Sequence, residues 1–114
     1  MIKRFAIALF VLTSVPLAAR AITPDQIASA SRMYNGQHVD VTGRVMHVRA
    51  RRLPSGAAYE RFSLCATRCI QAVVSGVPAL TEGQTITLHG TFYTWKNLGG
   101  YLLIRGVEVD AGSL

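Results

Sequence analysis

The sequence predicts an all-β domain, a small five-stranded barrel preceded by one short N-terminal helix. Three observations lead to this prediction: an early helix-start signature, five later segments in which apolar residues alternate with polar ones, and Gly, Pro and Asn residues between those segments. The chain has 114 residues, of which 50% are hydrophobic and 16% are charged. That length fits one domain, and that composition excludes a disordered chain or a membrane protein with several spans.

The first 21 residues have the features of a secretory signal peptide. A basic start at residues 3–4 precedes a mainly apolar run at 5–19, and Ala19-Arg20-Ala21 supplies small residues around a cleavage point. The alternative is an uncleaved membrane anchor, but the run is shorter than the roughly 20 residues of a spanning helix and contains Pro16. We therefore expect an exported, periplasmic protein whose mature domain covers residues 22–114 and has no membrane span after cleavage.

The helix is predicted to begin at Thr23 and to end at Asn35-Gly36. Thr23 is a good capping residue, Pro24 takes the first helical position, and Gln26 completes the capping-box pattern. Asparagine followed by glycine is a common helix stop.

The period of the apolar pattern changes to two at Gln37, which marks the start of the strands. The first strand runs from there to the basic residues near 49–52, and the others are expected at about 58–65, 69–74, 84–95 and 101–109. The apolar phase shifts after Val45, and Gly43 just before the shift indicates a bend or bulge; Gly90 indicates another. Residues 75–83 are expected to form a connection with one helical turn, and residues 111–114 to be frayed.

A long bent strand, two further strands, a connection and two last strands fit the partly open, five-stranded Greek-key barrel known as the OB-fold. The predicted fold is therefore an OB-fold barrel at residues 22–114, preceded by one short helix. A small β-sandwich with a leading helix is the main alternative.

Two cysteines, Cys65 and Cys69, flank the predicted hairpin turn between the second and third strands. Facing residues of paired strands lie close enough for a disulfide, and an exported protein meets an oxidising compartment. We therefore predict a structural disulfide of modest effect, because the loop that it closes is small. Free thiols, a redox pair and a metal site are the alternatives, but a C-x-x-C at a helix start is missing and two thiols do not complete a zinc site.

Short motifs along the strands resemble the tRNA-anti-like, anticodon-binding OB-fold family. The motifs are Tyr34-x-Gly36, Gly36-Gln37-x-Val39-x-Val41-x-Gly43-Arg44-Val45, Ile70-Gln71-x-Val73-Val74 and Gly83-Gln84-x-Ile86-x-Leu88-x-Gly90. The resemblance covers about residues 24–110 and implies nucleic-acid binding, with Arg49, Phe62 and Gln71 at the positions that contact bases. The alternation along the second strand places Phe62 on the same face as Leu64, so we interpret Phe62 as a core residue instead.

The densest basic cluster combines Arg49, Arg51 and Arg52 beside His47, at the end of the first strand and in the first hairpin loop. A second group flanks the last hairpin loop and consists of Trp95, Lys96 and Tyr101. In an OB-fold these two loops border the ligand groove, so arginines can contact phosphates while aromatic rings stack on bases. The alternative is a solvated strand edge beside a Trp95–Tyr101 pair at the rim of the core.

Catalytic and metal-binding signatures are weak. The histidines at 38, 47 and 89 lie on separate elements, although His89-x-x-x-Tyr93 matches the haem-attachment pattern of OB-fold haem chaperones. The six acidic residues are scattered, and the chain has no nucleophile or phosphate-loop motif. We therefore expect no enzyme activity, no cofactor and no metal.

The function expected from the sequence is a small exported binding module for single-stranded nucleic acid or another polyanion. The alternative is a periplasmic protein-interaction or envelope-stress module, with an envelope protein as its partner. Removal of the signal lowers the formal net charge from +6 to +3, because three basic residues lie within it. This mild charge favours the alternative, so the choice depends on where the arginines and aromatic rings lie.

Overall fold

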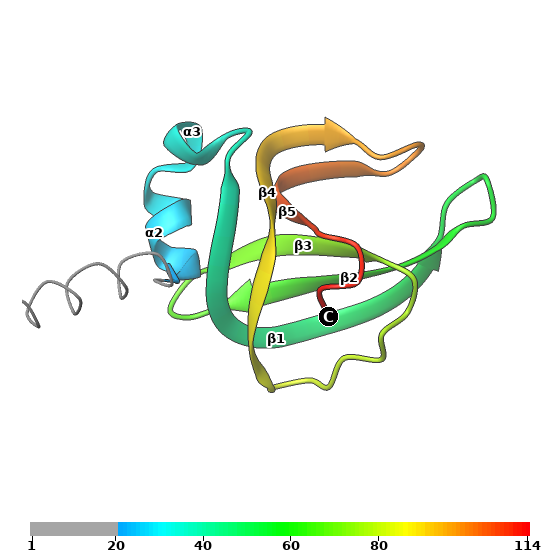
Figure 1. Cartoon of the computed structure of the whole chain (residues 1–114), viewed down its shortest axis with the longest axis horizontal. Helices are drawn as coiled ribbons and strands as arrows, with labels where there is room; N and C mark the ends of the chain where they lie inside the picture. Colours follow the sequence, from blue (N-terminus) through cyan, green and yellow to red (C-terminus); the bar gives the residue numbers. More distant parts are fainter. Residues whose placement is uncertain (1–20) are drawn as a thin grey trace, which may run out of the picture.

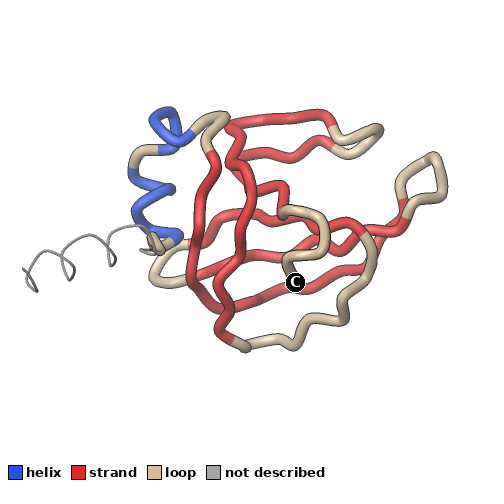
Figure 2. Tube along the Cα trace, viewed as in Figure 1, coloured by secondary structure: helices blue, strands red, loops and turns tan. Residues whose placement is uncertain are grey.

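The computed structural model describes residues 21–114, so the predicted signal peptide, apart from Ala21, lies outside the described residues. The fold is mainly β, with two short helices at its start (Figures 1 and 2). The elements are α2 (Pro24–Ser29), α3 (Ser31–Tyr34), β1 (His38–Arg52), β2 (Ala58–Cys65), β3 (Cys69–Ser75), β4 (Thr85–Asn97) and β5 (Leu102–Val109). The five predicted strands are confirmed, with ends that differ by a few residues. Within the described part of the chain, no helix is long and apolar enough to cross a membrane.

The strands close into a barrel in the order β1-β2-β3-β5-β4. β1 takes part in two ladders, because its first half pairs with β4 and its second half pairs with β2. The chain bends sharply between these halves, which brings the two ends of the sheet together (Figure 1). All ladders are antiparallel except that of β3 with β5, which is parallel.

The irregularity in β1 is a bulge at residues 47–48, later than the sequence predicts. The register with β2 shifts between Met46 and Arg49, and His47 has a positive φ of 56°. The Glu82 carboxylate accepts hydrogen bonds from both bulge amides, from His47 at 3.0 Å and from Val48 at 2.7 Å. These contacts lower the pKa of Glu82, the Val48 amide being the larger cause.

The prediction that Gly43 forms the bulge is wrong. A Cβ there would lie 3.0 Å from the Cys65 carbonyl oxygen, the Leu64 Cγ and the Pro24 Cγ. The glycine is therefore needed because α2 and β2 approach the β1 backbone closely. A Cβ at Gly90 would collide with the backbone of β5, so that glycine also marks a close approach.

The single predicted helix is divided in two at Ala30. The predicted capping box between Thr23 and Gln26 is present and starts α2. Ile27 anchors α2 in the core, whereas α3 turns to follow β4, where the Asn35 side chain accepts the Thr94 amide at 2.9 Å. One straight helix could not reach both sites, so the chain leaves the helical conformation between them.

The connection between β3 and β4 contains no helical turn, contrary to the prediction. Gly76, Ala79 and Gly83 all have positive φ, which leaves no run of helical backbone. The end of the connection is held by β1, since the Val45 amide donates to the Gln84 carbonyl at 2.8 Å.

Two apolar clusters stabilise the domain. The larger one fills the barrel and includes Phe62 and Phe92, both fully buried, so the interpretation of Phe62 as a core residue is confirmed. The smaller one lies outside the barrel between the two hairpins, where Tyr59, Val73 and Leu103 pack together. The predicted disulfide between Cys65 and Cys69 is also present.

Candidate functional site

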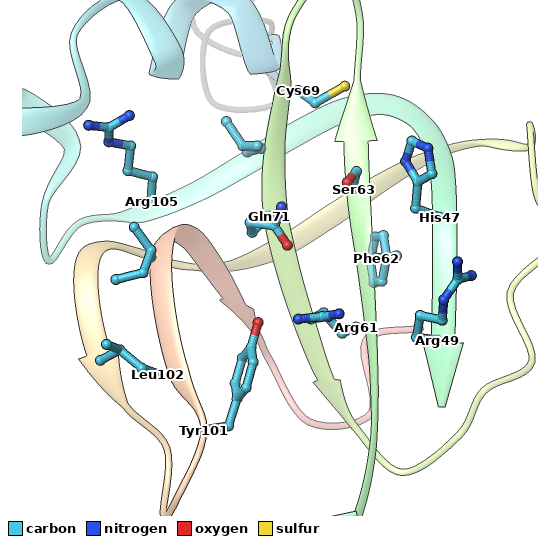
Figure 3. Close-up of a pocket in the computed structure, with 12 residues that line it drawn as sticks. His47, Arg49, Arg61, Phe62, Ser63, Cys69, Gln71, Tyr101, Leu102 and Arg105 are labelled. Atoms are coloured by element: carbon cyan, nitrogen blue, oxygen red, sulfur yellow. The ribbon is translucent and has the colours of Figure 1, made fainter. Parts of the chain in front are cut away.

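A groove of about 670 Å³ crosses the outer face of β1, β2, β3 and the start of β5 (Figure 3). Its lining consists of His47, Arg49, Arg61, Phe62, Ser63, Cys69, Ile70, Gln71, Tyr101, Leu102, Ile104 and Arg105. It is the larger of the two cavities that border the last hairpin, and its basic side chains make it the candidate site.

Regular strand alternation builds the floor of the groove. Phe62 points into the barrel, so its neighbours Arg61 and Ser63 point outward. The ladders then place Arg49 opposite Arg61 and Gln71 opposite Ser63. The floor therefore combines two guanidinium groups with an amide and a hydroxyl.

Two backbone irregularities add further basic side chains at the sides. His47 has a φ of 56° and Arg105 a φ of 47°, and both line the groove. Regular alternation would turn Arg105 inward with Leu103 and Val107, which are fully buried. The positive φ values cost about 1 kcal/mol or more each in residues other than glycine, and such strain is common at binding sites.

The groove carries positive charge without compensation. Among the described residues, no Asp or Glu lines it, and none of the guanidinium groups of Arg49, Arg61 and Arg105 forms an ion pair. Arg49 donates to the adjacent Val48 carbonyl at 3.0 Å, which leaves its other donors free. This arrangement attracts an anion that presents several acceptors.

Tyr101 forms one wall and is held in place by its neighbours. Its ring centroid lies 5.4 Å from that of Tyr59, and the Arg61 guanidinium lies 5.7 Å from it. Figure 3 shows its hydroxyl pointing into the groove towards Gln71 and Arg61. The ring is half-buried, so it offers part of one face or its hydroxyl to a ligand.

Exposed apolar side chains extend this wall along the last hairpin. Leu102 and Ile104 line the groove, and Trp95, which is 65% exposed, lies opposite Ile104 in the β4–β5 ladder. Directly paired residues share a face of the sheet, so the Trp95 ring continues the apolar strip beyond the groove.

Three of the seven predicted binding residues meet in the groove, namely Arg49, Gln71 and Tyr101. Arg51 and Arg52 instead line a separate shallow depression with Val77, and Arg52 donates to the Gly56 carbonyl at 2.9 Å. Trp95 lies beyond the groove wall, as described above.

Lys96 lies in a neighbouring cavity on the other side of Tyr101, where its Nζ is 2.6 Å from a Glu108 carboxylate oxygen. The hydrogen bond to Glu108 raises the pKa of Lys96. Since its charge is already paired within the protein, it is less available to a ligand.

Sequence reasoning missed Arg61 and Arg105. Arg61 could have been found from the alternation, because it precedes a core phenylalanine on the same strand. Arg105 could not, since its position depends on a positive φ at a residue that is not glycine.

The described residues contain no group of three His, Cys, Asp or Glu side chains arranged to hold a metal ion. Two histidines bind carboxylates on the barrel surface: His38 contacts Asp110 at 2.8 Å and His89 contacts Asp40 at 2.6 Å. The hydrogen bond to Asp110 raises the pKa of His38.

No protein-family model matches this chain, and a search of curated proteins finds no match either. The resemblance to anticodon-binding barrels therefore stays a prediction. The argument about function rests on the groove.

Proposed function

We propose that the domain is an OB-fold barrel. The strand order β1-β2-β3-β5-β4, with β1 shared between two ladders and β3 parallel to β5, supports this assignment. A simple up-and-down barrel would pair β3 with β4, whereas here β5 lies between them. The groove also lies on the β2–β3 face, which is the face that this fold uses for oligomeric ligands.

The function we propose is the binding of a polyanion, with single-stranded nucleic acid as the leading ligand. The observation that carries the proposal is the convergence of Arg49, Arg61 and Arg105 on one groove without a carboxylate among its described lining residues. Arginines bind phosphates through paired donors, and a groove of one sign of charge attracts a linear polyanion. In this proposal the three guanidinium groups bind the backbone, and Gln71 hydrogen-bonds a base edge.

Aromatic and apolar side chains beside the arginines support a nucleic acid over a purely charged polymer. Bases stack on exposed aromatic rings regardless of sequence. Trp95 supplies such a ring on the hairpin, and Tyr101 supplies part of one inside the groove. Double-stranded nucleic acid would not offer its bases to these rings, so the proposal specifies a single strand.

We propose further that the protein is exported, with residues 1–21 as its signal peptide, and that it acts as a binding module without catalysis. The Cys65–Cys69 disulfide supports an oxidising compartment such as the periplasm.

The second candidate is a module that binds an envelope protein. It is favoured by the exposed strip of Trp95, Leu102 and Ile104, since contiguous apolar side chains often mark protein interfaces. Such an interface would depend on the strip and would respond weakly to salt, whereas nucleic-acid binding depends on the arginines and responds strongly.

The test is the binding of fluorescein-labelled oligothymidylate of 12 nucleotides to the oxidised protein, purified from expression of the full chain, at 50 and 200 mM salt. Contact with three phosphates predicts a fall in affinity of about 20-fold between the two salt concentrations. Polyphosphate as a competitor separates recognition of charge alone from recognition of nucleotides. No binding at 50 mM, or binding insensitive to salt, would contradict the proposal.

A further inference from the structure

A second cavity, of about 330 Å³, continues the groove at the junction between the barrel and the helices. It is lined by Ala28 and Ser31 from the helical segment, by Arg68 from the β2–β3 turn and by Phe92. Its remaining lining residues, Cys69, Ile70 and Arg105, also line the groove. The two cavities therefore share one wall and form a continuous track.

Arg105 lies at the boundary of the two cavities. In Figure 3 its side chain extends away from Tyr101, towards the helical segment drawn in pale blue. The positive φ at this residue turns the side chain out of the barrel, where it contributes to both spaces. A ligand bound along the groove would therefore reach the second cavity by passing Arg105.

Arg68 gives the second cavity a basic group of its own. The turn that carries it is fixed by the disulfide and by the Ala66 amide, which donates to the Arg68 carbonyl at 2.9 Å. The Arg68 guanidinium lies 3.3 Å from the Ser29 hydroxyl and forms no ion pair within the described residues. The Asp25 carboxylate lies nearby, but it accepts the backbone amide of Arg68, at 2.6 Å.

We propose that this second cavity is a phosphate subsite that binds the same single strand as the groove, beyond Arg105. The track then runs from Arg49 and Arg61 through Arg105 to Arg68, with the Ser31 side chain on its wall. This proposal rests on the proposed function and extends it: the helical segment and the disulfide turn take part in binding, although they lie outside the barrel sheet.

The proposal predicts that affinity depends on ligand length in a way that requires Arg68. A trinucleotide fills the groove, whereas an octanucleotide also places a phosphate beside Arg68. Loss of one phosphate contact makes the salt dependence shallower by about 0.7 in the slope of log affinity against log salt concentration.

The experiment compares oligothymidylates of three and eight nucleotides on the wild-type protein and on Arg68→Gln. We expect Arg68→Gln to bind the trinucleotide as the wild type does, and to bind the octanucleotide about fivefold more weakly at 50 mM salt. Arg44→Gln is the matched control, because it removes one exposed charge that lines neither cavity, and it should lower the affinity for both lengths equally and slightly. Circular dichroism checks that each variant is folded.

A second readout locates the ligand. In amide NMR spectra the octanucleotide should shift the signals of Ala28 and Ser31, and the trinucleotide should leave them unchanged. If Arg68→Gln binds both lengths like the wild type, or these amides do not respond, the subsite is refuted while the groove stands. If neither oligonucleotide binds the wild type, the proposed function fails and the subsite fails with it.

Discussion

Two pairs of arginines show how differently the same residue can be placed. Arg51 and Arg52 are adjacent in the sequence and lie at the exposed end of the β1–β2 hairpin, where Arg52 binds the carbonyl of its own turn. Arg61 and Arg105 come from different strands, yet both line the groove. The pair that is densest in the sequence is dispersed into solvent, and the pair that is distant in the sequence converges.

The physical difference lies in the surroundings of the charges. Water and salt screen exposed charges at a hairpin tip, whereas the walls of a groove concentrate the field of several charges on one ligand. Residues that line one groove also bind one ligand at the same time, so their contributions add. Local charge density in a sequence is therefore a weaker guide to a polyanion site than the face of the strand on which each charge lies.

The largest expected effect tests the strand faces themselves, through two neighbours on β2. Phe62→Ala removes a fully buried ring and should lower the free energy of unfolding by about 3–5 kcal/mol. Arg61→Gln changes a partly exposed groove residue and should alter stability by less than about 0.5 kcal/mol while weakening oligonucleotide binding. Urea denaturation and binding measurements check both, and a stability loss at Arg61 similar to that at Phe62 would contradict the assignment of faces.

The next effect concerns the turn that closes one end of the groove. Replacing both Cys65 and Cys69 by alanine should lower the free energy of unfolding by about 2 kcal/mol, because the disulfide closes a short loop. Octanucleotide binding should weaken too, since the turn carries Arg68, while the tip pair Arg51 and Arg52 should be unaffected. Denaturation of the wild type with and without a reductant is the control, and equal stability in the two forms would count against a stabilising disulfide.

A smaller effect is expected at the bulge that turns His47 into the groove. Glu82→Gln replaces a carboxylate that accepts two amides, so the bulge should loosen and oligonucleotide affinity should fall about threefold. The folded-state pKa of Glu82 is lowered, so its contribution to stability is present above the ordinary pKa of a glutamate and is lost as the pH falls through the lower, folded value. The stability difference between wild type and Glu82→Gln should therefore shrink below about pH 4. A difference that stays constant down to pH 2 would contradict this role.

The smallest effect is expected at His38, which lies in neither arginine group and contacts Asp110. Its folded-state pKa is raised, so the contact stabilises the protein at low pH and the benefit is lost as the pH rises through that value. Asp110→Asn should return the pKa of His38 towards its ordinary value in NMR titrations and leave oligonucleotide binding unchanged. An unchanged His38 titration would show that the pair does not form in solution.

The fold was largely predictable from local patterns. Period-two alternation identified all five strands, and the capping residues Thr23 and Gln26 identified the start of the helix. The bulge position was not predictable, because it depends on a carboxylate from the distant connection, Glu82. The break at Ala30 depends on tertiary packing, since α2 and α3 follow different strands.

The candidate site was predictable in part. Arg49, Gln71 and Tyr101 were found because they lie on regular strands or at a hairpin end. Lys96 was predicted to bind a ligand but pairs with Glu108, and that pairing depends on how β4 and β5 are aligned. Arg105 required the backbone conformation itself.

The most direct test of the account compares the two arginine pairs in one assay. The double variants Arg61→Gln/Arg105→Gln and Arg51→Gln/Arg52→Gln remove the same charge, so any difference reflects position alone. We predict that the groove variant loses about 10-fold or more in affinity for a 12-nucleotide oligothymidylate and that its salt slope becomes shallower by about 1.4, while the tip variant keeps the wild-type slope. Equal losses in the two variants, or a larger loss in the tip variant, would contradict the claim that the groove is the binding site.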